Sequence, residues 1–242
     1  MENLRDQFDS VAERRQLLEV HTDRDRIASE LEQQFSTRNV RIVRKPALSV
    51  KNPDFVIVRD ADREFRAAVG VEHLEAMLSP EIHPPWRIGN GDDDAAERFR
   101  FLENTIFTSY DRRQLLAVSR EIEERAWRTG SGAMFIGFQN TAAFRTQLPV
   151  YERLVRECDL TVTVFVENEW RGETVDGIDV VSDAASEIGA FWFVLFDGGG
   201  SDLKKCGLLA EEREEGQYYG FWTDEPERVD EMIAYLKSLR GF

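Results

Sequence analysis

The chain has 242 residues, 42% hydrophobic and 32% charged, which is the composition of a folded globular protein. Its 46 acidic against 31 basic residues give a formal net charge of −15, which argues against nucleic acid or an anionic membrane as a partner. The longest apolar stretch, 190–196, is far below the roughly 20 residues that cross a bilayer, and the acidic N-terminus lacks the apolar segment of a signal peptide, so we expect a cytoplasmic protein.

The bases are almost all arginine, because lysine occurs at only five positions. High negative charge with scarce lysine favours a salt-loving host over a merely acidic mesophilic protein.

Strands and helices alternate in the first 80 residues. We expect strands near 40–42 and over 16–20, 55–58 and 65–69, where β-branched residues are bounded by proline or turn residues. A helix follows Asp23, because Ile27, Leu31 and Phe35 recur with helical spacing. A short helix over 71–78 ends this part.

Residues 81–94 are rich in proline, glycine and aspartate and predict a linker, followed by a helix over 95–102. Beyond it we expect helices over 119–129, over 142–157 with a break at Pro149, and over 226–239. Strands are expected over 114–118, 133–138, 161–166, 178–181, 191–196, 206–211 and 218–222.

An eight-residue pattern, acid-Arg-Arg-Gln-Leu-Leu-x-Val, occurs at 13–20 and again at 111–118. Read as a duplication, it predicts two pseudo-repeated halves, 1–80 and a larger 95–242, joined by 81–94. The other reading is a chance match in a chain rich in Arg and Leu. The element order predicts an α/β fold, a mixed β-sheet flanked by helices.

Known catalytic and cofactor motifs are missing. The glycine-rich run 197–202 lacks the Gly-Lys-Ser/Thr ending of a phosphate loop and favours a hairpin turn with positive φ. The three histidines have no metal-ligand spacing, and Cys158 and Cys206 are isolated. We therefore expect no metal and no cofactor, and assign no catalytic residue.

The expected helix 119–129 begins at a capping Ser119 and carries two i,i+4 pairs, Glu121–Arg125 and Glu124–Arg128. This pattern favours a surface helix crossed by salt bridges. The alternative is that Arg120 and Trp127 face a cavity.

Several strings resemble the DICT sensory domain family. They are Ser-Arg-Glu-Ile-Glu-Glu-Arg-Ala-Trp at 119–127, Gly-Phe-Gln at 137–139, Trp-Phe-Val-Leu-Phe-Asp-Gly-Gly-Gly at 192–200, and the runs 208–213 and 219–223, with 35–40 and 55–60 in the first half. The resemblance extends over nearly the whole chain. It implies one non-enzymatic sensory domain of the kind found in salt-loving archaea, and offers no functional residues to carry over.

A DICT-like function implies a partner. The strings include no kinase, cyclase or DNA-binding segment, so the expected partner is a histidine kinase, response regulator or transcription regulator. A small-molecule ligand is also expected, and a homo-oligomer stays open.

We predict a ligand site where helix 119–129 meets the C-terminal strands, with arginine donors, flat tryptophan walls and one orienting amide. Its residues are Arg120, Trp127, Arg128, Gln139, Trp192 and Trp222. The alternative is that the three tryptophans are packed core.

The alternative function is a small-molecule enzyme. It would use the carboxylates of Asp197, Glu211 or Glu212 beside the late aromatic cluster as acid or base. A carboxylate with a strongly raised pKa in a pocket would favour this reading, whereas salt-paired carboxylates would favour the sensory module.

Overall fold

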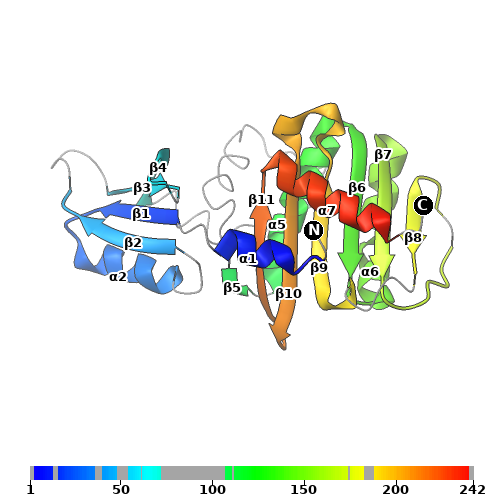
Figure 1. The fold of residues 1–242 in the computed structure, drawn as a ribbon, viewed down its shortest axis with the longest axis horizontal. Helices are drawn as coiled ribbons and strands as arrows, with labels where there is room; N and C mark the ends of the chain where they lie inside the picture. Colours follow the sequence, from blue (N-terminus) through cyan, green and yellow to red (C-terminus); the bar gives the residue numbers. More distant parts are fainter. Residues whose placement is uncertain are drawn as a thin grey trace.

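The computed structural model describes residues 3–12, 16–35, 40–47, 54–60, 62–71, 107–110, 112–173, 175–182 and 188–239. Within them the chain forms two mixed sheets with α-helices, which confirms the predicted α/β class (Figure 1). No helix in these ranges is long and apolar enough to cross a membrane.

The smaller sheet has the strand order β2-β1-β3-β4. Its strands are β1 (Gln16–His21), β2 (Val40–Lys45), β3 (Phe55–Arg59) and β4 (Phe65–Gly70). β1 and β2 are parallel, joined through α2 (Asp25–Gln34), and the other two pairs are antiparallel. Side chains alternate across a strand, so Leu18 and Val20 join the core with Ile27 and Leu31 of α2 while Leu17 and Glu19 are on the other face.

The larger sheet has the order β5-β11-β10-β9-β6-β7-β8. Its strands are β5 (Phe107–Tyr110), β6 (Ser131–Phe138), β7 (Asp159–Val166), β8 (Ile178–Val181), β9 (Phe191–Phe196), β10 (Cys206–Glu214) and β11 (Gln217–Thr223). β6, β7 and β8 are parallel, and every other pair is antiparallel.

Helices cover both faces of this sheet. α5 (Arg112–Thr129) and α6 (Thr141–Glu157) pack on the face that carries Met134, Ile136 and Val194. α1 (Asp6–Ala12) and α7 (Pro226–Ser238) pack on the opposite face (Figure 1).

The N-terminal helix α1 thus packs on the larger sheet, although the strands of that sheet come much later in the chain. Phe8 contacts the rings of Phe191, Tyr219 and Phe221, with centroids 5.2–6.0 Å apart. Gln7 accepts a buried hydrogen bond from Arg228 of α7 at 2.8 Å. Residues from both ends of the chain therefore build one core.

Most predicted elements are present, but the strand over 114–118 is wrong. These residues form the start of α5, where Leu115, Val118, Ile122 and Ala126 make one buried helical stripe. The matching segment 16–20 is a strand, so the two copies of the eight-residue pattern have different structures. The predicted duplication is therefore wrong. The eight-residue pattern can occur in both elements because it fits helical as well as extended spacing.

Two details of the neighbouring helices also differ. Ser119 is inside α5, where its hydroxyl donates to Leu115 O at 3.0 Å, and does not cap a helix start. α6 is continuous through Pro149, and its capping residue is Asn140, which accepts from Ala143 N at 2.8 Å. Phe144 and Leu154, on either side of Pro149 along the helix, are both fully buried.

The glycine run joins antiparallel β9 and β10, as the hairpin interpretation predicts. Gly198, Gly199 and Gly200 have φ of 79°, 59° and 90°. The expected helices over 71–78 and 95–102 and the linker 81–94 lie outside the described residues, and the domain boundaries stay a prediction.

Candidate functional site

Helix α5 carries an unusual number of buried charges. Glu121, Glu123 and Glu124 are 7%, 1% and 5% exposed, although all three are polar side chains of one helix. The predicted surface helix is therefore wrong, since charged groups are almost never this buried unless they have partners. At 100° per residue, Glu123 lies on the opposite flank of the helix from Glu121 and Glu124.

On the flank toward α6, Glu123 is held by two donors. The hydroxyl of Tyr151 donates to Glu123 Oε1 at 2.8 Å, and Arg120 forms an ion pair with Oε2. Arg120 also donates to the amide oxygen of Gln147. Burial raises the pKa of Glu123, and Arg120 and Tyr151 act against that rise. These four side chains form the α5–α6 network.

On the other flank of α5, the buried carboxylate of Glu121 has weaker hydrogen-bonding and ion-pair partners than Glu123. Its Oε1 is buried without a hydrogen bond in the part of the chain described, and the nearest cation is Arg128 Nη2 at 3.8 Å. Burial, with the neighbouring charge of Glu124, raises the pKa of Glu121. Arg125 forms an ion pair with Asp224 at 3.1 Å, not with Glu121 as predicted.

The predicted Glu124–Arg128 pair is present, at 3.9 Å. Cys206 at the start of β10 is fully enclosed, and burial raises the pKa of its thiol to about 12. Such a thiol stays protonated at neutral pH and is a poor nucleophile.

The aromatic residues of the predicted site lie on the face that α5 covers. Trp192 donates its indole N–H to Ser119 Oγ at 3.1 Å and meets Tyr218 edge-on, with ring centroids 5.9 Å apart. Trp222 is 5% exposed in the same core. Both rings therefore pack in the core between the sheet and α5.

The polar residues of the predicted site point to different partners. Arg120 contacts Glu123 and Gln147, whereas Arg128 is on the opposite flank of α5 beside Glu121 and Glu124. Trp127 is partly buried and has Arg153 of α6 5.9 Å from its ring. Gln139 donates to Glu212 at 3.1 Å. The assignment of all six residues to one site stays a prediction.

The carboxylates of the alternative function all have structural partners. Asp197 Oδ1 accepts from the backbone N–H of Ala133 and Gly199, both at 2.9 Å. Glu211 forms ion pairs with Arg5 and Arg213. Glu212 accepts from Gln139 and from Gly216 N. Across the described ranges, no group of three or more His, Cys, Asp or Glu is arranged to hold a metal ion.

A pocket of about 210 Å³, lined by aromatic and aliphatic side chains and two carboxylates, lies where α6 meets β8. Phe144 and Trp170 pack with ring centroids 4.7 Å apart, and Arg145 is 5.3 Å above the Trp170 ring. The remaining lining is Leu148, Glu173, Val175, Ile178, Asp179 and Val180. None of the six predicted residues lines it. Sequence reasoning missed this pocket; the one available signal was a tryptophan in an otherwise polar loop.

The comparisons with known proteins concern this same region. Residues 96–213 match the DICT family, described as the sensory domain in diguanylate cyclases and two-component systems. Comparison with curated proteins gives no match. The runs 35–40, 55–60 and 219–223 fall outside the matched residues, so the match covers less of the chain than the resemblance implied.

Among solved structures, the chain is similar to the crystal structure of polyphosphate kinase from Porphyromonas gingivalis, with a TM-score of 0.39 and 13% identity. The similarity covers 94% of this chain and 46% of that one, so this chain spans less than half the length of the kinase chain. A likeness this weak carries no argument about fold or function. The family match spans α5, α6 and β6 to β10, and residues 96–213 of this chain are thus similar to the DICT family of sensory domains.

Proposed function

We propose that this chain is a non-enzymatic signal-input module, which senses a small ligand and relays the signal to a separate two-component or cyclic-nucleotide signalling protein. The observation that carries the proposal is the DICT match over 96–213. The partners of Glu211 and Glu212 support it, because salt-paired and hydrogen-bonded carboxylates are not poised for acid–base work.

The ligand has two candidate positions within the matched residues. The pocket beside Trp170 combines aromatic and aliphatic side chains with the carboxylates of Glu173 and Asp179, which suits a small molecule that has an aromatic part and hydrogen-bond donors. The predicted set around Trp127 combines arginine with aromatic rings. The lining of the Trp170 pocket favours the first position.

One experiment addresses the ligand. The full chain is purified from its native host, and its absorption and mass spectra are recorded for co-purifying small molecules. We expect a bound small molecule that Trp170→Ala loses and Trp127→Ala retains. Loss in Trp127→Ala alone would instead support the predicted six-residue site, and retention by both variants would contradict both positions.

A second experiment addresses the relay and the absence of turnover. Deleting the gene in the native host should change response-regulator phosphorylation or cyclic-dinucleotide levels, and the full chain should restore them. Unchanged levels of both would contradict the relay. Turnover of a nucleotide or metabolite by the purified chain would overturn the non-enzymatic assignment.

A further inference from the structure

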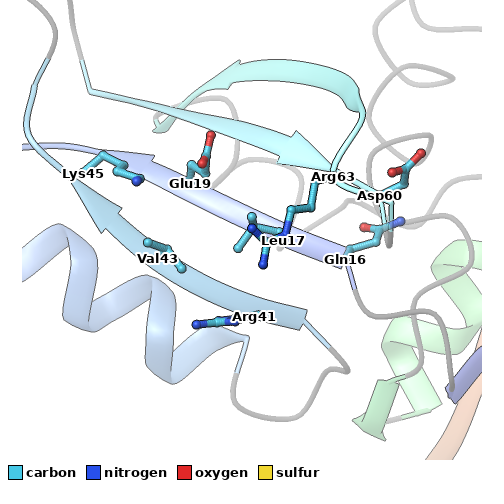
Figure 2. Close-up of a pocket in the computed structure, with 8 residues that line it drawn as sticks. All are labelled: Gln16, Leu17, Glu19, Arg41, Val43, Lys45, Asp60 and Arg63. Carbon is cyan, nitrogen blue, oxygen red and sulfur yellow. The ribbon is translucent and has the colours of Figure 1, made fainter.

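The smaller sheet carries a cavity of about 420 Å³, outside the residues that match the DICT family. It lies over β1 and β2, and Asp60 and Arg63, between β3 and β4, line one end of it (Figure 2). Its size is in the range of pockets that bind small molecules.

The strand register explains why these side chains share one face. β1 and β2 are parallel, with Leu17 beside Arg41 and Glu19 beside Val43, while the alternate residues of β1 enter the core with α2. Lys45 is at the end of β2, two residues beyond Val43. Two apolar side chains therefore alternate with cations on the pocket floor.

The turn adds a third cation. Arg63 has φ +67°, a backbone conformation uncommon for residues other than glycine, asparagine and aspartate. Asp60 fixes the turn, because its Oδ1 accepts from the N–H of Asp62 at 3.0 Å and of Glu64 at 2.9 Å. Figure 2 shows the Arg63 side chain extending from the turn toward Leu17.

The acidic and the basic side chains that line the pocket differ in their ion pairs within the described residues. Glu19 forms an ion pair with Arg59 at 2.9 Å, and Asp60 with Arg66 at 2.8 Å. The side chains of Arg41, Lys45 and Arg63 form no ion pair within the described part of the chain. The acids are thus neutralised by other arginines, and three cations remain in a chain with a net charge of −15.

We propose that this pocket binds a small phosphorylated molecule, with its phosphate held by Arg41, Lys45 and Arg63 and its less polar part against Leu17 and Val43. A guanidinium presents two parallel N–H donors that match phosphate oxygens, and a lysine adds a mobile point charge. The site is separate from the pocket beside Trp170, and its occupancy does not depend on signal relay.

The test is calorimetric titration of the folded full chain with pyrophosphate and with AMP, starting at low ionic strength, where exposed charges are screened least. We expect saturable binding of one equivalent that weakens as salt is raised. Arg63→Asn and Lys45→Gln should each weaken binding about tenfold or more, as expected for a lost charge-assisted hydrogen bond. Arg63→Asn is chosen because asparagine tolerates the left-handed backbone, so circular dichroism and the melting temperature should stay unchanged.

Arg44→Gln is the matched control. It removes the same charge from the same strand, but Arg44 is beside Lys45 on the alternate side and pairs with Asp25. We expect its affinity to be within twofold of the unsubstituted chain. No binding by the folded chain, or an equal loss in Arg44→Gln, would overturn the proposal. Either result would leave the ligand and relay experiments above unaffected.

Discussion

Removing the hydroxyl of Tyr151 tests whether the α5–α6 network stabilises the fold. Tyr151 is 2% exposed and donates to Glu123, which is 1% exposed, at 2.8 Å. A hydrogen bond to a charged group contributes about 1.5–3 kcal/mol. Because Tyr151→Phe keeps the ring and its packing, we expect the free energy of unfolding to fall by about 1.5–3 kcal/mol.

The assay is urea unfolding followed by the fluorescence of the five tryptophans, with thermal melting in parallel. For a chain of this size the predicted loss corresponds to a decrease in Tm of about 3–12 °C. A double-mutant cycle adds the specific test. In a Glu123→Gln background the same hydroxyl meets a neutral amide, so Tyr151→Phe should cost only about 0.5–1.5 kcal/mol there.

Tyr219→Phe is the matched control, because Tyr219 is half-buried on the opposite face of the sheet. We expect it to cost less than about 1 kcal/mol. A cost for Tyr151→Phe below about 0.5 kcal/mol, or the same cost in both backgrounds, would refute the reasoning that the buried carboxylate depends on this donor.

Three further predictions concern the same core. Burial raises the pKa of Glu121 above 4.5, so the unfolding free energy should fall as pH rises from about 4.5 through the folded pKa. Urea unfolding at a series of pH values should show this loss in the unsubstituted chain and not in Glu121→Gln. Parallel pH curves for the two chains would contradict the prediction. Gly199→Ala should cost about 1–3 kcal/mol more than Gly200→Ala by thermal melting, because a Cβ at 199 meets the first carbonyl oxygen of β6 whereas 200 is open; equal costs would refute the steric argument. Iodoacetamide at pH 8 should label Cys158 before Cys206 in the folded chain, by mass spectrometry, with the order lost in urea, since Cys206 is buried with a pKa of about 12.

The sequence predicted elements well where the pattern was local and clear. The strands over 178–181 and 191–196 have the predicted bounds, and the glycine run after Phe196 is the predicted hairpin connection. It failed at 114–118, because Gln-Leu-Leu-x-Val satisfies a strand in β1 and a helix in α5 equally well. Local preference is weak there, and packing against the sheet decides between the two.

The candidate sites were harder to predict, because each joins segments far apart in the chain. The burial of Glu123 depends on Tyr151, 28 residues away, and the ion pair of Arg125 depends on Asp224. Spacing along α5 indicated only the i,i+4 ion pairs. These are the pairs expected between charged side chains on a solvent-exposed helix.

The sequence by itself determined the α/β class, most helices and strands, the net charge of −15 and the resemblance to DICT domains, since these follow from composition, short-range periodicity and recurring strings. Tertiary structure decided which charges are buried, that α1 joins the core of the larger sheet, and that three cations gather over β1 and β2. Burial and charge pairing depend on contacts between distant residues, and no local sequence pattern specifies which distant residue will make the contact.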